Sequence, residues 1–356
     1  MTTPRYQYQP PPPTEAQLEA LELLRASERV LLTGHERPDG DCLGSQAALA
    51  RVLNARGQSA FVLNPDPPEE RYGEVTGLAE FLVDDGGEIP EHDLVVMLDG
   101  GDLSRTGALA TRLEAAGSRK LVVDHHLHEG DEWWDGAFID TSASATGVLV
   151  RRIAAHLDAE VDAGVARAIF TTLVTDTGWF KYSNTDEETM HIAAEMLAAG
   201  VRPAEVYGDL FQREEPDHPR FLAAALSRTA YFGDGRIAVI DLPLGPDGRS
   251  SAADGDVALD VLRSVEQVEV ALIIREIGPS RTKLSARSKG AFNVQKLAHG
   301  FGGGGHAKAA GATIEQPLVH ARLELVEAAV EQLARTKERR SAPRTAAEAA
   351  RRKPGA

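Results

Sequence analysis

The sequence predicts an α/β protein in which a doubly wound parallel-sheet domain is followed by a smaller α/β domain with a mixed sheet. Two near-continuous apolar runs, at 93–98 and 120–123, are typical of parallel strands buried on both faces. Helical patterns lie between the strand patterns, and this alternation favours a doubly wound sheet. In the last third of the chain, several short strand patterns and a Gly-Asp-Gly hairpin signal indicate the second sheet.

Composition limits the class of protein. The chain has 356 residues, of which 42% are hydrophobic and 26% charged, as in soluble proteins of two domains. Its single cysteine, Cys42, excludes an internal disulfide framework and a thiolate metal cluster, and it fits a cytoplasmic location. No apolar run approaches the roughly 20 residues that span a bilayer, so we expect no membrane partner. The net charge of −16 argues against a protein that coats long nucleic acids, although bound metals could still attract an anionic substrate.

The first domain is predicted over residues 14–200, after a disordered, Pro-rich leader at 1–13. Thr14 is a suitable N-cap for the first helix, and Gly57 is a suitable end for the second. Thr185 and Glu188 form a capping box for the last helix of the domain. The elements expected in order are a helix at 14–26, strands at 30–33 and 59–63 with a helix between them, strands at 93–98 and 120–123, and helices at 144–156, 162–175 and 185–200.

A linker at 201–228, punctuated by prolines, leads to the second domain at 229–336. This domain is expected to hold a hairpin over 231–240, strands at 269–277 and 282–287, a short helix at 293–299, a Gly-rich segment at 300–311 and a closing helix at 318–333. Residues 337–356 form a disordered basic tail with seven Lys or Arg and two Glu. The tail is either a flexible extension or a weak attractor of nucleic acid.

Acidic and histidine residues follow several of the predicted elements. Open α/β sheets place their sites at the carboxyl ends of strands, where these residues lie. Imidazole with carboxylate is a ligand set suited to Mn, Zn, Co or Fe. In the first loop alone, a polar turn whose Asp side chains bind the local backbone is an equal alternative. The convergence of two His and four Asp favours a metal site formed by His35, Asp39, Asp41, Asp99, His125 and Asp176.

Four segments in order resemble the motifs of the DHH phosphoesterase superfamily: HERPDGDCLGS, VVMLDGGDLSR, VVDHHLHEGD and TLVTDTGWF. GFGGGGHAKAAG, after SARS, resembles the DHHA1 domain that follows the DHH domain in these proteins. The resemblance covers about residues 14–336. The GGGH segment and the chain length make the sequence most similar to the stand-alone bifunctional nanoRNase and 3′-phosphoadenosine-5′-phosphate (pAp) phosphatase group, the NrnA-like proteins.

The resemblance implies two Mn²⁺ ions, with Co²⁺ or another divalent ion as the alternative. The first ion would be held by His35, Asp39 and Asp99, and the second by Asp41, Asp99, His125 and Asp176, so that Asp99 bridges the two. His126 would act with Asp99 in catalysis by facing the scissile phosphate; support of the other ligands is its alternative role. Arg105 matches a phosphate-contacting Arg of the second motif.

In the second domain, the resemblance implies that Arg287, Gly304, Gly305 and His306 bind a phosphate or a base. Gly-rich loops bring backbone N–H groups close to anions, although close packing alone also requires glycines. A cleft between the two domains would accommodate a mono- or dinucleotide rather than a duplex.

The expected function is hydrolysis by a metal-activated water. The substrates would be short RNA, dinucleotides such as pApA, and pAp, giving mononucleotides and AMP; the chain would be an oligoribonuclease and a 3′(2′),5′-bisphosphate nucleotidase. The rivals are a RecJ-type single-strand DNA exonuclease, a cyclic-dinucleotide phosphodiesterase, a family II inorganic pyrophosphatase and, from another class, a nucleotide-binding regulator with a dead site. The intact set of ligands argues against the regulator. A homodimer is one alternative for the oligomeric state, since dimers occur among relatives.

Overall fold

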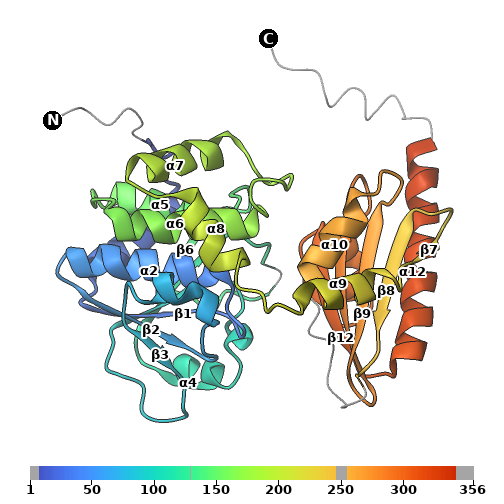
Figure 1. Cartoon of the computed structure of the whole chain (residues 1–356). Coiled ribbons are helices and arrows are strands. Elements are labelled where there is room, and N and C mark those ends of the chain that lie inside the picture. Colours follow the sequence, from blue (N-terminus) through green and yellow to red (C-terminus); the bar gives the residue numbers. More distant parts are fainter. Residues whose placement is uncertain (1–7, 129, 246–254, 342–356) are drawn as a thin grey trace. The chain divides into compact units, whose positions relative to one another are not determined.

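The computed structural model describes residues 8–128, 130–245 and 255–341 (Figure 1). The chain divides into two compact units, residues 1–213 and residues 214–356. The first seven residues of the predicted leader and the predicted tail from residue 342 onward lie outside the described residues.

Unit 1 contains a six-stranded sheet in the order β3-β2-β1-β4-β5-β6, and every pair of neighbouring strands is parallel. This arrangement confirms the predicted doubly wound sheet. Two short strands, β3 and β6, were not among the predicted elements. The strands are β1 (Arg29–Thr33), β2 (Ser59–Asn64), β3 (Phe81–Val83), β4 (Leu94–Leu98), β5 (Arg119–Asp124) and β6 (Gly136–Ile139). The helices are α1 (Glu15–Ala26), α2 (Gly40–Ala55), α3 (Gly73–Thr76), α4 (Leu109–Ala115), α5 (Thr146–His156), α6 (Ala163–Asp176), α7 (Glu187–Ala198) and α8 (Pro203–Phe211).

Both faces of this sheet are buried under helices, and alternate strand residues point to opposite faces. Val30 and Leu32 of β1 pack with α2, α5 and α6 in the larger hydrophobic core. Leu31, between them, packs with Leu109 and Leu113 of α4 in a separate cluster. Figure 1 accordingly shows α2, α5 and α6 on one side of the sheet and α4 on the other. Burial on both faces is why the central strands read as continuous apolar runs.

Helices α5 and α6 approach each other closely at Gly147. A Cβ atom at this position would lie 1.7 Å from Oγ1 and 2.5 Å from Cβ of Thr172 on α6. Thr172 is fully buried, and its hydroxyl donates to the carbonyl of Ile169 at 2.6 Å. The absence of a side chain at Gly147 therefore permits the observed distance between the two helices.

We expect Gly147→Ala to lower the free energy of unfolding by about 1–3 kcal/mol, because an added methyl group in a packed core forces helices apart. Urea denaturation followed by circular dichroism measures this change. Gly117→Ala is the matched control, since nothing lies within 4 Å of its new Cβ, and its effect should stay within about 0.5 kcal/mol. Equal stability of Gly147→Ala and Gly117→Ala would contradict the close packing.

Unit 2 contains a mixed six-stranded sheet in the order β11-β12-β10-β9-β8-β7, in which β8 and β9 are parallel and the other pairs antiparallel. The predicted hairpin is confirmed: β7 and β8 pair across Gly233, Asp234 and Gly235, all of which have positive φ. The strands are β7 (Ala230–Phe232), β8 (Ile237–Leu242), β9 (Val270–Gly278), β10 (Arg281–Ser288), β11 (Gly304–Gly305) and β12 (Ala309–Ile314). The helices are α9 (His218–Leu226), α10 (Gly255–Ser264), α11 (Val294–His299) and α12 (Leu318–Ser341).

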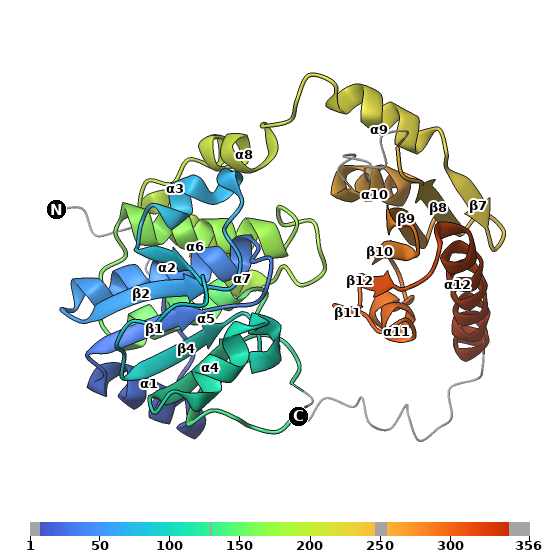
Figure 2. The same ribbon diagram turned by 90° about the horizontal axis from the view of Figure 1, so that it is seen from below.

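The sheet of unit 2 is also covered on both faces. Helices α11 and α12 pack on one face and contribute Leu297, Leu325 and Leu333 to its core. Helices α9 and α10 pack on the other face through Ala225 and Leu259. Figure 2 shows these two pairs on opposite sides of β8 and β9.

No helix in the described parts of the chain combines the length and apolar character needed to cross a bilayer.

Candidate metal centre

The strand order of unit 1 reverses between β1 and β4, which are parallel neighbours. In doubly wound sheets, ligands bind beside the carboxyl ends of the strands at such a switch point. The loop after β1 carries His35 and Asp39, Asp41 lies in the first turn of α2, and Asp99 follows β4 directly. The parallel arrangement therefore gathers these residues at one edge of the sheet.

Backbone amides at the amino ends of two helices fix Asp39 and Asp41. Asp39 is the N-cap, and its Oδ1 accepts from the backbone N–H groups of Asp41 and Cys42 at 3.0 and 3.1 Å. Asp41 is buried, and its two oxygens accept from the N–H groups of Thr146 and Gly147 at 2.7 and 3.1 Å. Because these two amides begin α5, the positive end of a second helix also faces Asp41.

Asp99 lies at the middle of the centre. Its φ of 60° is in the left-handed region, which Asp tolerates better than most residues. Oδ2 lies 3.5 Å from Nε2 of His35, and Oδ1 lies 3.6 Å from Nε2 of His125. Oδ1 also accepts from the hydroxyl of Thr146 at 3.1 Å. Each oxygen of this carboxylate therefore faces a different imidazole.

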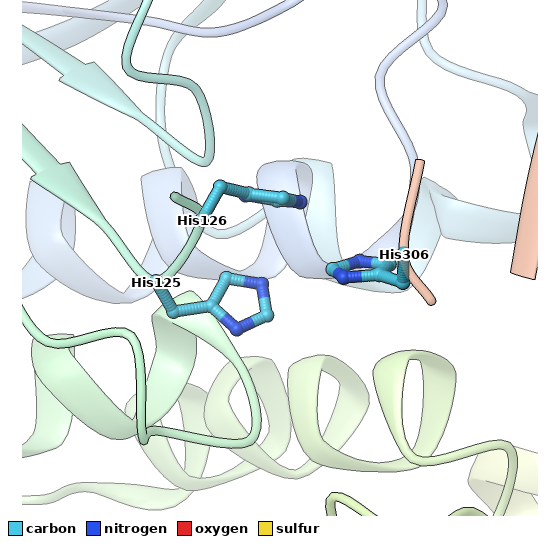
Figure 3. A group of neighbouring side chains, drawn as sticks. All are labelled: His125, His126 and His306. Carbon is cyan, nitrogen blue, oxygen red and sulfur yellow. The ribbon is translucent and has the colours of Figure 1, made fainter. Parts of the chain in front are cut away.

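His125 follows β5 directly, and Figure 3 shows its ring beside that of His126. Its Nδ1 lies 3.1 Å from the carbonyl of Ala143, so Nδ1 carries the proton and donates it. Nε2 faces oxygens of Asp41, Asp99 and Asp176 at 3.6–3.7 Å, distances too long for hydrogen bonds. Burial lowers the pKa of His125, which favours the neutral imidazole that binds metals.

The electrostatics of the centre also fit a cation. Burial and the charge of Asp99 raise the pKa values of Asp41 and Asp176 well above the usual range. Burial acts in the same direction on Asp99, but the hydrogen bond to His35 and the charges of His126 and His125 hold the pKa of Asp99 well below the usual range. Carboxylates packed this closely repel one another when ionised. A divalent ion between them would remove that repulsion, and the oxygen and imidazole donors suit such an ion.

Contacts of 3.5–3.7 Å thus link five of the six predicted ligands, namely His35, Asp41, Asp99, His125 and Asp176. The sixth is Asp39. Desolvation by burial and the charge of Asp99 raise the pKa of Asp39, while the charge of His35 lowers it. Groups of side chains that could hold a metal ion include Asp41, Asp99 and His125, whose ligand atoms lie within 4.8 Å of one another.

His126 is oriented by Asp124, the last residue of β5. Oδ1 of Asp124 accepts from the backbone N–H and from Nδ1 of His126, at 3.1 and 2.8 Å. Burial disfavours the protonated imidazole, but this hydrogen bond and the charge of Asp99 outweigh it and raise the pKa of His126 to about 9. The two rings of His125 and His126 meet edge to face, with centroids 4.5 Å apart (Figure 3). His126 is therefore fixed beside His125 by its two bonds to Asp124.

Cys42 is buried next to the centre and fills space. Its Sγ approaches the carbonyl of Leu98 at 3.9 Å, and a Cβ at Gly34 would lie only 2.1 Å from that sulfur. Burial and the charges of Asp99 and Asp39 raise the pKa of the thiol well above its usual range. A protonated thiol is a poor metal ligand, because the thiolate is the form that binds.

The predicted substrate-binding residues lie in both units. In unit 1, Arg105 is exposed and its Nη1 donates to the backbone carbonyl of Asp99 at 3.3 Å. In unit 2, Arg287 of β10 lies opposite Ala309 of β12, and His306 and Ala309 exchange backbone hydrogen bonds in the turn between β11 and β12. Arg287 and His306 are therefore brought to the same end of the sheet.

The glycines of this turn differ in their packing. A Cβ at Gly303 or Gly305 would lie 2.1 or 2.6 Å from a carbonyl oxygen of β12, so close packing requires glycine at both positions. Gly304 is exposed, and a Cβ added there would meet nothing within 4 Å, so packing does not explain this glycine.

Several residues that hold the centre together were not predicted. Thr146 and Gly147 bind Asp41 and Asp99, and Asn184 donates to the carbonyls of Ser144 and Asp176 at 3.0 and 3.2 Å. The sequence predicts this helix from residue 144, close to its observed start at 146, but Asp41 lies 105 residues away from Thr146 along the chain. Such contacts leave no local signal.

Comparison with known proteins agrees with this architecture. Residues 29–201 match the family model described as "DHH family, N-terminal domain", and residues 239–336 match the DHHA1 domain. Bifunctional oligoribonuclease and PAP phosphatase NrnA of Thermus thermophilus is 31% identical over 316 residues, which are 88% of this chain and 93% of that protein.

Two solved structures are also similar. An exopolyphosphatase-related protein of Bacteroides fragilis aligns with a TM-score of 0.78 and 25% identity, over 89% of this chain and 96% of that one. RecJ of Thermus thermophilus, solved in complex with Mn²⁺, aligns with a TM-score of 0.52 and 15% identity, over 90% of this chain and 55% of that one, which shows a shared fold.

The chain is a two-unit α/β protein whose first unit carries a cluster of carboxylates and imidazoles that could hold a metal ion. The matches at both domains and along nearly the whole chain give its family. The chain belongs to the DHH family and is a phosphoester hydrolase of that family, with a DHHA1 domain after the DHH domain.

Proposed function

We propose that this hydrolase cleaves short oligoribonucleotides and pApA-type dinucleotides to mononucleotides and dephosphorylates pAp to AMP. The observation that carries the proposal is the match to a protein whose name gives both activities, at 31% identity over 93% of its length. The gathering of the predicted ligands at the switch point of the sheet supports a working centre rather than a dead one.

Two divalent ions, which we take to be Mn²⁺, complete the centre in this proposal. His35, Asp39 and Asp99 hold one ion, and Asp41, Asp99, His125 and Asp176 hold the other. When bound, such a pair lowers the pKa of a water molecule and stabilises charge that develops at phosphorus. The nitrogen and oxygen donors favour Mn²⁺ over a thiolate-seeking ion, and Co²⁺ is the alternative.

The side chains of unit 1 position the substrate. In the protonated form of His126, Nδ1–H donates to Asp124, and Nε2–H is left to donate to an oxygen of the scissile phosphate. A fixed donor at this position stabilises the transition state, in which negative charge increases on the phosphoryl oxygens. Arg105, bonded to the carbonyl of Asp99, contacts a second phosphate oxygen.

Arg287, Gly304, Gly305 and His306 bind a terminal phosphate or base of a short substrate in this proposal. Gly304 supports this role, since packing does not explain the glycine and its N–H lies on an exposed strand.

We also propose a cytoplasmic location, on the ground of the single cysteine. A homodimer is our proposal for the oligomeric state, and light scattering would detect it.

Turnover of a substrate panel in Mn²⁺ tests the function. We expect hydrolysis of pAp, pApA and a five-nucleotide RNA at rates well above those for cyclic di-AMP, pyrophosphate and a long single-stranded DNA. The control is Asp99→Ala, which should lose every activity. Preferred digestion of the long DNA would move the protein to the RecJ-type exonucleases, and turnover of none of these substrates would favour a nucleotide-binding regulator.

A further inference from the structure

The loop between β6 and α5, residues 140–145, contacts one proposed ligand and leads directly into the helix that binds another. The carbonyl of Ala143 accepts from Nδ1 of His125, which turns Nε2 toward the carboxylates. The loop then ends at α5, whose first two N–H groups bind Asp41. The conformation of this loop therefore sets the direction of one ligand nitrogen and the position of one carboxylate.

Asp140 holds the loop in this conformation. Its Oδ1 accepts from the backbone N–H and the hydroxyl of Ser142 at 2.9 and 2.6 Å. Its carbonyl accepts from the N–H of Ala143 at 3.1 Å, and its own N–H donates to the carbonyl of Asp124 at 3.3 Å. Asp140 thus connects Asp124, the residue before His125, to Ala143, whose carbonyl orients the His125 ring.

Arg152, in the second turn of α5, anchors Asp140 to the helical layer. Its Nη1 donates to Oδ2 of Asp140 at 2.7 Å, and its Nε and Nη2 donate to the carboxylate of Glu188 on α7 at 2.8 and 2.6 Å. Arg152 is only 5% exposed, so water competes little for these bonds. Tyr8 of the N-terminal segment donates its hydroxyl to the same Glu188.

We propose that Asp140 and Arg152 are positioning residues of the metal centre: through the carbonyl of Ala143 they hold His125 in the direction from which it binds the ion. The inference rests on the proposed metal role of His125 and on no assumption about the substrate. Groups that orient a metal-binding His typically change metal affinity 10- to 100-fold when removed. Neither residue belongs to the motifs of the sequence, and neither is among the proposed ligands.

The neighbouring Arg151 offers a matched control. It is equally buried, at 5% exposure, and forms the same type of paired bond, donating to Glu195 on α7 at 2.7 and 2.8 Å. These bonds join α5 to α7 and involve no residue of the loop at 140–145. Substitution at Arg151 therefore disturbs the packing of α5 on α7 without directly releasing the loop.

The test is the Mn²⁺ affinity of the full-length protein without substrate, by calorimetry, together with the melting temperature. We expect Asp140→Asn and Arg152→Lys to weaken Mn²⁺ binding about tenfold. Arg151→Lys should lower the melting temperature to a similar extent as Arg152→Lys but keep Mn²⁺ affinity within about twofold of the wild type. If Arg152→Lys does not fold, the Mn²⁺ affinities of Asp140→Asn and Arg151→Lys are compared instead, and they test the positioning role.

Wild-type Mn²⁺ affinity in Asp140→Asn would overturn the inference, as would an equal loss of affinity in Arg151→Lys and Asp140→Asn. His125→Ala separates this failure from a failure of the proposed centre. If His125→Ala weakens Mn²⁺ binding while Asp140→Asn does not, the centre stands and the positioning role falls. Unchanged Mn²⁺ binding in His125→Ala would overturn both.

Discussion

Asp99→Ala should reduce kcat/KM by more than about 1,000-fold, which corresponds to roughly 4 kcal/mol of barrier. The reason is the central position of this carboxylate, whose two oxygens face His35 and His125 at 3.5 and 3.6 Å. In the proposed centre both ions share Asp99, so its loss should weaken both sites together. Calorimetric titration with Mn²⁺ and single-turnover hydrolysis of pApA measure the two effects.

Asp93→Ala is the control for this change. Asp93 directly precedes β4 and Asp99 directly follows it, so the two residues lie at opposite ends of the same strand. Its carboxylate accepts from the N–H groups of Glu28 and Arg29, far from the proposed ligands along β1. We expect Asp93→Ala to cost stability and to leave Mn²⁺ affinity unchanged. Retention of two tightly bound Mn²⁺ ions by Asp99→Ala would rule out the shared ligand.

His126→Gln should lower kcat about 100- to 1,000-fold while Mn²⁺ affinity stays the same. His126 is bonded to Asp124 at 2.8 Å and is assigned no ligand role, so its loss removes a donor to the phosphate and not a bond to an ion. Steady-state kinetics with pAp and pApA, combined with Mn²⁺ titration, separate the two roles.

The surface residue His191 provides the reference for this experiment. Its side chain is 64% exposed on α7, and His191→Gln should behave as the wild type. A tenfold loss of Mn²⁺ affinity in His126→Gln would instead identify His126 as a ligand or as a support of the ligands. That result would confirm the alternative role considered from the sequence.

The sheet of unit 1 could be predicted because its central strands carry an unbroken apolar signal. All five residues of β4 are buried, which is possible only for a strand covered on both faces. The weak edge strands gave no such signal: β3 has three residues, none of them buried, and β6 alternates between buried and half-buried positions. Their existence depends on pairing with β2 and β5 rather than on their own composition.

The gathering of His and Asp side chains at the candidate centre could be predicted, but the residues that hold those side chains in place could not. Asp99 and Asp176 follow predicted elements directly, and His35 lies two residues after a predicted strand. The topology of a parallel sheet then brings the strand ends together. The left-handed backbone of Asp99 and the bonds of Asp140 depend on three-dimensional neighbours. A polar residue in a loop looks the same in sequence whether it meets solvent or fixes a ligand.

The contact between Tyr8 and α7 has a consequence for the order of events during synthesis on the ribosome. Tyr8 bonds to Glu188 and Glu195, partners that lie 180 and 187 positions later in the chain. Tyr8 therefore cannot form these contacts until most of unit 1 has been translated, at about 5–20 residues per second. Asp176 emerges shortly before Glu195. We expect a nascent chain that ends before residue 176 to bind Mn²⁺ weakly, and docking of Tyr8 to be among the last steps in the maturation of the centre.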